Sequence, residues 1–69
     1  MKTLKDLEAL ITRYQATKPH VQFHLEPLNQ DGAAWMLVAH ENERTRQVAR
    51  GALKTLHTYM QGRLDEAGL

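Results

Sequence analysis

The sequence predicts an α+β fold of the order α-β-β-α, with a two-stranded antiparallel hairpin packed on two helices. Three observations lead to this class. A helical pattern of apolar residues opens the chain, from residue 3 to about residue 16. Two strand-like stretches, 20–28 and 33–40, lie on either side of a turn. A second helical pattern runs from residue 42 to about residue 60 or 64.

The first helix is predicted by apolar residues that recur three and four positions apart, as on the buried face of an amphipathic helix. Thr3, followed three positions later by Asp6, approximates a capping box. Pro19 ends the helix, because a residue that precedes proline is pushed out of helical geometry. The apolar positions are Leu4, Leu7, Ile11 and Tyr14, with Leu10 widening the stripe.

The two strands are predicted from different patterns. In the first, Val21, Phe23 and Leu25 alternate with polar residues. Pro27 marks an edge or an end of this strand, because proline cannot donate to a ladder. The second strand, 33–40, contains the longest apolar run of the chain, and turn-forming residues precede it. These residues are Asn29, Gln30, Asp31 and Gly32.

The length of the loop between the strands decides which side chains share a face, because a shift of one residue turns a strand over. With an odd number of loop residues, Trp35 and Leu37 share the face of the first strand's apolar residues. With an even number, Met36 and Val38 do so instead, and the sequence leaves both registers open. In either register the second strand carries apolar groups on both faces.

The second helix is predicted to begin at Asn42, a good N-cap residue, with Glu43 as a favourable acid in the first turn. Gly62 is expected to end this helix, which leaves residues 63–69 as a frayed tail. Its expected core stripe consists of Val48, Ala49, Ala52, Leu53, Leu56 and Met60, with Leu64 as an extension.

One small domain is expected over residues 1–69. A single core of this size supplies only about 3–5 kcal/mol. The chain has no cysteine, so no disulfide can add to this stability. Because two helices can cover only one face of a hairpin, we expect a homodimer that buries the other face. Its expected interface residues are Trp35, Leu37 and Tyr59.

A basic stripe on the second helix is a further candidate binding surface. Between residues 44 and 64 the sequence has five Lys or Arg residues and no acid. Such a row binds an acidic protein or the phosphates of a nucleic acid, or it is an ordinary solvated helix face. The members of the predicted row are spaced by four, four and three positions. They are Arg46, Arg50, Lys54 and His57.

The segment 45–56 resembles the closing helix of double-stranded RNA-binding domains, which also place a basic, alanine-rich helix after a sheet and behind an opening helix. The resemblance is confined to this segment. That family has the order α-β-β-β-α, whereas we expect two strands here. The paired lysines at the start of its last helix have no equivalent in Arg44 and Arg46. No functional residue is carried over.

Catalysis, metal binding and cofactors have no support in the sequence. Serine and cysteine, two common nucleophiles, are absent, and no glycine-rich phosphate loop is present. His20 and His24 would lie about 13 Å apart along a strand, too far to bind one zinc ion together. No apolar run approaches the roughly 18 residues of a membrane helix. We therefore expect a cytoplasmic protein that is not an enzyme and has no cofactor.

The function expected from these patterns is protein binding. The chain would act as a homodimer and bind another protein, and a partner with an acidic surface would suit the basic stripe. Adaptors, inhibitors and regulators from bacterial or mobile-element genomes act in this way. Its contact surface would be the basic stripe or the sheet face that bears Trp35. The alternative is nucleic-acid binding through the basic stripe.

Overall fold

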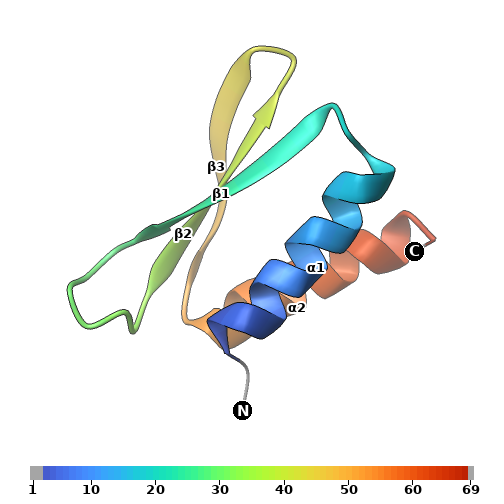
Figure 1. Cartoon of the computed structure of the whole chain (residues 1–69). Coiled ribbons are helices and arrows are strands. Elements are labelled where there is room, and N and C mark those ends of the chain that lie inside the picture. The colour runs from blue at the N-terminus through green and yellow to red at the C-terminus, as the bar shows by residue number, and fades with distance from the viewer. Residues whose placement is uncertain (1–2, 69) are drawn as a thin grey trace.

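The computed structural model describes residues 3–68, and the ends of the predicted domain, residues 1, 2 and 69, lie outside the described residues. Its elements are α1 (Leu4–Thr17), β1 (Val21–Pro27), β2 (Trp35–Glu41), β3 (Arg44–Gly51) and α2 (Leu53–Glu66). The strands form one antiparallel sheet in the order β1-β2-β3 (Figure 1). The predicted α+β class is confirmed, and the predicted number of two strands is wrong.

β3 covers residues that the sequence predicts as the start of the second helix. Asn42 and Glu43 have positive φ values of 51° and 65° and form a two-residue hairpin turn, as in a type I′ turn, instead of a helix cap. Val48 forms a β-bulge, because Leu37 of β2 pairs with Ala49 and the next residue of β2 pairs with Gln47. Both Val48 and Ala49 pack against the core. In the sequence, these two adjacent apolar residues look like the start of the apolar stripe of a helix, which is why the sequence predicts a helix here.

α2 begins only at Leu53, because the chain turns sharply from β3 into the helix at Gly51. The φ of Gly51 is 139°, which side chains rarely allow, and an added Cβ would lie 3.4 Å from the side chain of Thr55. The N-terminus of α2 therefore lies directly at the end of β3.

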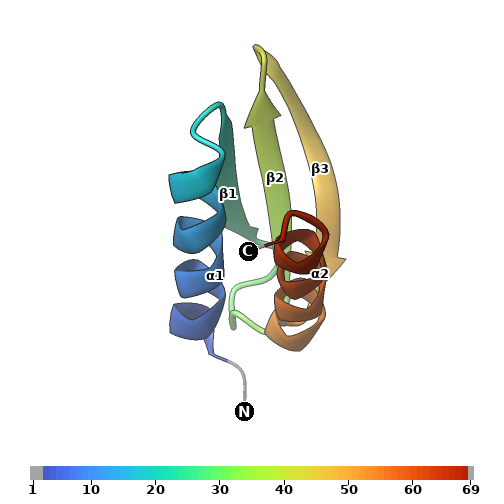
Figure 2. The same ribbon diagram turned by 90° about the vertical axis from the view of Figure 1, so that its right-hand side faces the viewer.

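Both helices lie on one face of the sheet (Figure 2). α1 packs against β1, α2 packs against β3 and β2, and the two helices pack against each other. No helix of residues 3–68 covers the opposite face, which we call the open face. Its side chains are mostly polar; they are Gln22, His24, Glu26, Met36, Val38, His40, Thr45, Gln47 and Arg50.

The register found between β1 and β2 is the one expected for an odd number of loop residues. Leu25 pairs with Leu37, and the loop between the strands consists of seven residues, 28–34. Trp35 and Leu37 therefore face the helices. The predicted turn is confirmed, since the Asn29 side chain accepts a hydrogen bond from the Ala33 N–H at 3.0 Å.

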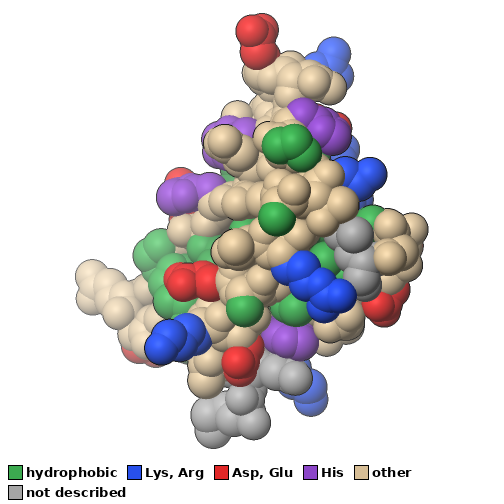
Figure 3. Space-filling view, turned by 45° about the vertical axis from the view of Figure 1, so that its right-hand side comes forward, with side chains coloured by type: hydrophobic (Ala, Val, Ile, Leu, Met, Phe, Trp, Pro, Cys, Tyr) green, Lys and Arg blue, Asp and Glu red, His purple; other side chains and the backbone are tan. Residues whose placement is uncertain are grey.

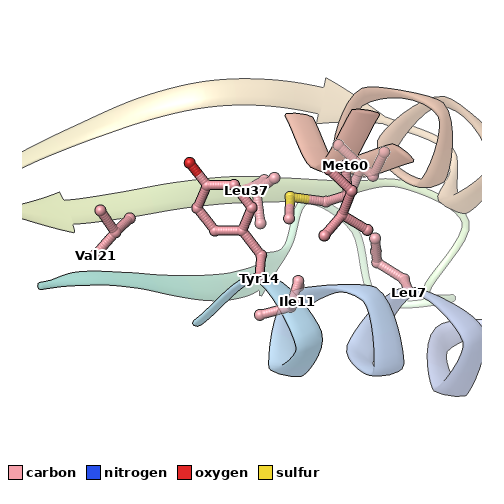
Figure 4. Close-up of a cluster of buried hydrophobic side chains, with 8 residues drawn as sticks. Leu7, Ile11, Tyr14, Val21, Leu37 and Met60 are labelled. Atoms are coloured by element: carbon pink, nitrogen blue, oxygen red, sulfur yellow. The ribbon is translucent and has the colours of Figure 1, made fainter. Parts of the chain in front are cut away.

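The core lies between the helices and the sheet, and its apolar side chains point toward one another from both layers (Figure 4). α1 ends and begins as predicted to within a residue, and Thr3 and Asp6 form its capping box. α2 continues through Leu64 to Glu66, so the tail predicted from residue 63 is wrong for residues 63–66. The fully buried side chains, each with 0% exposure, are Leu7, Leu37, Leu56, Met60 and Leu64.

Candidate functional site

The predicted apolar interface is largely part of the core. Leu37 is fully buried and cannot contact a partner unless the helices move away, so its predicted role is wrong. Trp35 is half-buried against the core, and its Nε1 donates to the Gly32 carbonyl at 2.9 Å. Tyr59 is also half-buried against the core. Within residues 3–68 the large exposed apolar side chain is Leu28. The surplus apolar face that motivated the homodimer is thus absent there.

The residues of the predicted basic stripe lie on two elements. Arg46 and Arg50 belong to β3, and Lys54 and His57 belong to the first two turns of α2. Arg46 pairs with Ala39 on the helix-side face of the sheet, whereas Arg50 pairs with a residue of the open face. The prediction of a single helical row is therefore wrong, because half of the row is strand.

These cations nevertheless follow one border of the molecule. β3 is an edge strand, and α2 starts where β3 ends. Arg44 and Arg50 are six positions apart, so this border extends about 20 Å along the strand. We call it the basic edge. It consists of Arg44, Arg46, Arg50 and Lys54, all exposed.

No carboxylate of residues 3–68 forms an ion pair with the basic edge. Glu41 is opposite Arg44 in the ladder, but its Oε1 lies 3.6 Å from Nε2 of His20. Arg44 was not predicted as a site residue, although the acid-free stretch begins with it. Four cations on one edge, without acidic partners among the described residues, create a local positive potential that the net charge of +1 does not reveal.

A hollow of about 880 Å³ lies beside this edge, near the turn of the β2–β3 hairpin. Ala39, Arg44 and Arg46 line it, and all three belong to the helix-side face of the sheet. Figure 3 shows that Lys and Arg side chains lie at the projecting tip and along the right-hand side of this view, with an acidic side chain also at the tip. The lining residues are Ala39, Glu41, Asn42, Arg44, Thr45 and Arg46.

The N-terminus of α2 adds to the positive potential. Its N-cap residue is Ala52, which has no side chain that could accept from the first backbone N–H groups, and its first turn contains no acid. The cap and the first turn therefore do not compensate the positive end of the helix dipole, and Lys54 lies within the same turn.

The other edge of the sheet differs. On β1 the N–H of Val21 donates to the Lys18 carbonyl at 3.0 Å, and the N–H of Phe23 donates to Oε1 of Gln15 at 2.6 Å. Pro27 at the end of β1 has no N–H. Along β3 no backbone hydrogen bond other than the ladder to β2 is formed within the described residues. The sheet therefore has one closed edge and one open edge.

Arg63 does not belong to the candidate site. Its Nη2 donates to the Tyr14 hydroxyl at 2.9 Å, and its guanidinium lies over the same ring, 5.4 Å from the centroid. Burial opposes the charged form, but the hydrogen bond with Tyr14 and the surrounding charges outweigh it and raise the pKa of Arg63. This cation joins α2 to α1.

Residues 3–68 have neither a metal-binding cluster nor a membrane-spanning helix. They contain no group of three or more His, Asp or Glu side chains that could hold a metal ion. No helix among them has the length and apolar character needed to cross a bilayer. His24 lies 3.4 Å from Glu26 and His40 contacts Thr45 at 2.8 Å, and both pairs are exposed.

Comparisons with known protein families, with curated proteins and with solved structures found no match to this chain. The element order bears on the resemblance of residues 45–56 to double-stranded RNA-binding domains. The observed order, α-β-β-β-α, is the order of that family. The third strand removes one difference, while the paired lysines of the family remain absent, and residues 45–51 are strand instead of helix.

Proposed function

We propose that this chain is a small protein-binding module whose basic edge binds an acidic segment of a partner protein. The observation that carries the proposal is the set of four exposed cations on an open edge strand and the adjoining helix start, none of them paired with a carboxylate of the described residues. An acidic partner would supply the missing counter-charges.

Two features favour a protein partner over a nucleic acid. The hairpin carries Glu41 and Glu43 beside Arg44, and a phosphate backbone, which is charged at every nucleotide, could not avoid these carboxylates as a peptide with spaced acids can. A protein segment can present charges of both signs. The unpaired backbone of β3 is in addition complementary to another polypeptide backbone and has no counterpart in a phosphodiester chain.

The proposal is tested with a short fluorescent peptide rich in glutamate and a matched peptide with glutamine at every glutamate. Exposed ion pairs contribute about 0.2–1 kcal/mol each. The double substitution Arg46→Glu with Arg50→Glu turns attraction into repulsion, so we expect about a tenfold weaker binding in fluorescence anisotropy.

The matched control is Lys5→Glu with Arg13→Glu, which changes the net charge equally at two exposed positions of α1. This variant should bind nearly as the unchanged chain does. Equal weakening by both double variants would mean that only net charge matters, and equal binding of the glutamine peptide would remove the role of charge. Either result would overturn the proposal.

Duplex nucleic acid is the second candidate, and the element order favours it. Single strands are less suited, because the open sheet face has no Phe, Tyr or Trp on which bases could stack. Binding to duplex RNA or DNA should weaken with a slope of about −0.9 per neutralised phosphate in a plot of log affinity against log salt. The absence of a gel shift at low salt would end this candidacy.

A further inference from the structure

We infer that the acidic partner binds by strand addition, as a fourth strand paired with β3 along Arg44–Gln47. This inference rests on the proposed function and specifies how its partner is bound. It follows from three properties of the sheet: which edge is open, how far that edge is regular, and how the charges alternate along it.

β1 offers almost no free donors to an added strand. In an antiparallel pair, groups that point to the neighbouring strand alternate with groups that point outward. The outward set on β1 includes Val21 and Phe23, whose N–H groups are bonded to α1 or to the turn after it. Leu25 follows in the same set, and then Pro27, which has no N–H. Leu25 is left as the single free outward donor of β1.

β3 offers a regular but short edge. Arg44, Thr45, Arg46 and Gln47 pair in sequence with β2, and all four are exposed. The bulge at Val48 interrupts the ladder at the next position. Beyond the bulge Val48 and Ala49 are half-buried against the core. An added strand therefore pairs with the part that precedes Val48.

The charges select the added strand. Arg44 and Arg46 are two residues apart on the helix-side face, about 7 Å from each other along the strand. A strand with an acid at every second position places one carboxylate near each guanidinium. The hollow of about 880 Å³ on this side leaves room for those side chains. A second copy of β3 would instead bring arginines against arginines, so the same charges disfavour edge-to-edge pairing of the chain with itself.

The experiment uses the full chain, labelled with ¹⁵N, and a capped peptide in which glutamate alternates with threonine or valine. Two further peptides carry N-methyl groups at alternate backbone positions, one on each edge of the extended peptide. N-methylation removes a donor and blocks pairing at that edge only. We expect one methylated peptide to bind as the parent does and the other to bind at least about tenfold more weakly.

Amide resonances should report the location. We expect the parent peptide to shift the resonances of residues 44–47 and to protect from exchange the amides of Thr45 and Gln47, which point away from β2, with smaller effects on β1. Arg44→Glu with Arg46→Glu should abolish these shifts, whereas Arg50→Glu, beyond the bulge and on the open face, should weaken binding less.

The outcomes separate the two proposals. If both methylated peptides bind equally while Arg46→Glu with Arg50→Glu still weakens binding, strand addition is refuted and the basic edge remains a docking surface. If no glutamate peptide binds, or if the arginine substitutions have no effect on binding, the proposed function is refuted together with binding by strand addition.

Discussion

Tyr14 shows how much one side chain connects in this small core. Its ring meets Phe23 of β1 edge to face, with centroids 5.5 Å apart, and its hydroxyl accepts from Arg63 of α2. The side chain is 5% exposed and thus links α1, the sheet and α2 at one point. The helical spacing predicts that Tyr14 is buried, whereas its partner 49 positions away in the chain appears only in the fold.

Tyr14→Phe should therefore destabilise the chain while its ring packing remains. A hydrogen bond to a charged group contributes about 1.5–3 kcal/mol, and this one is only partly buried, so we expect a loss near the lower value. For a domain of this size that corresponds to a fall in Tm of about 4–8 °C per kcal/mol. The fall in Tm is measured by monitoring thermal unfolding with circular dichroism.

Tyr59→Phe is the matched control, since the Tyr59 hydroxyl makes no hydrogen bond within the described residues. A fall in Tm of the same size for both variants would contradict the role of the Arg63 contact. Because the pKa of Arg63 is raised, this cation keeps its charge from acid to well above neutral pH, and the difference between Tyr14→Phe and the unchanged chain should not vary over that range.

At the scale of elements, the hairpin of β2 and β3 decides where the cations lie. Residues 44–47 are polar throughout, so no alternation of apolar side chains marks them as a strand. Asn42 serves equally well as a helix cap and as the first residue of a type I′ turn, and the sequence does not separate the two. Pairing with β2 satisfies those backbone groups of residues 44–51 that point toward β2, and this decides for the strand.

Glu43→Gly tests the hairpin turn. The φ of Glu43 is 65°, a region that costs a residue with a side chain about 1–2 kcal/mol and glycine nothing. Part of the gain is offset by the greater freedom of glycine in the unfolded chain. We expect a net stabilisation of up to about 1 kcal/mol in urea unfolding.

Glu43→Gln is the control for this substitution, because it removes the charge and keeps the side chain. It should leave the unfolding midpoint nearly unchanged. If Glu43 instead followed a helix cap, as the sequence predicts, Glu43→Gly would destabilise the chain, so the sign of the change distinguishes the two structures.

At the scale of the whole molecule, the two faces of the sheet have different roles. The helices cover the apolar face, including Leu37, and the open face is mostly polar. Of the edges, β1 is closed by its own neighbours and β3 carries arginines. The homodimer predicted from the sequence thereby loses, among residues 3–68, the apolar surface that motivated it.

The oligomeric state can be measured directly. Without an apolar surplus on residues 3–68, and with repulsion between copies of β3, we expect a monomer at micromolar concentration. Light scattering should give a mass near 7.9 kDa. Twice that mass would support the homodimer instead. If Trp35→Ala then abolished the dimer, the interface predicted from the sequence would be supported.

The sequence by itself determined α1 with its capping box, the strands β1 and β2 and the turn between them, because each depends on residues that are neighbours in the chain. It also identified Arg46, Arg50, Lys54 and His57 as a basic group. The tertiary structure alone decided that residues 44–51 are a strand, since a polar edge strand with a bulge is stabilised by the ladder to β2 and not by its own spacing. It likewise decided which edge is open, because Gln15 and Lys18 close β1 through contacts that no local pattern indicates.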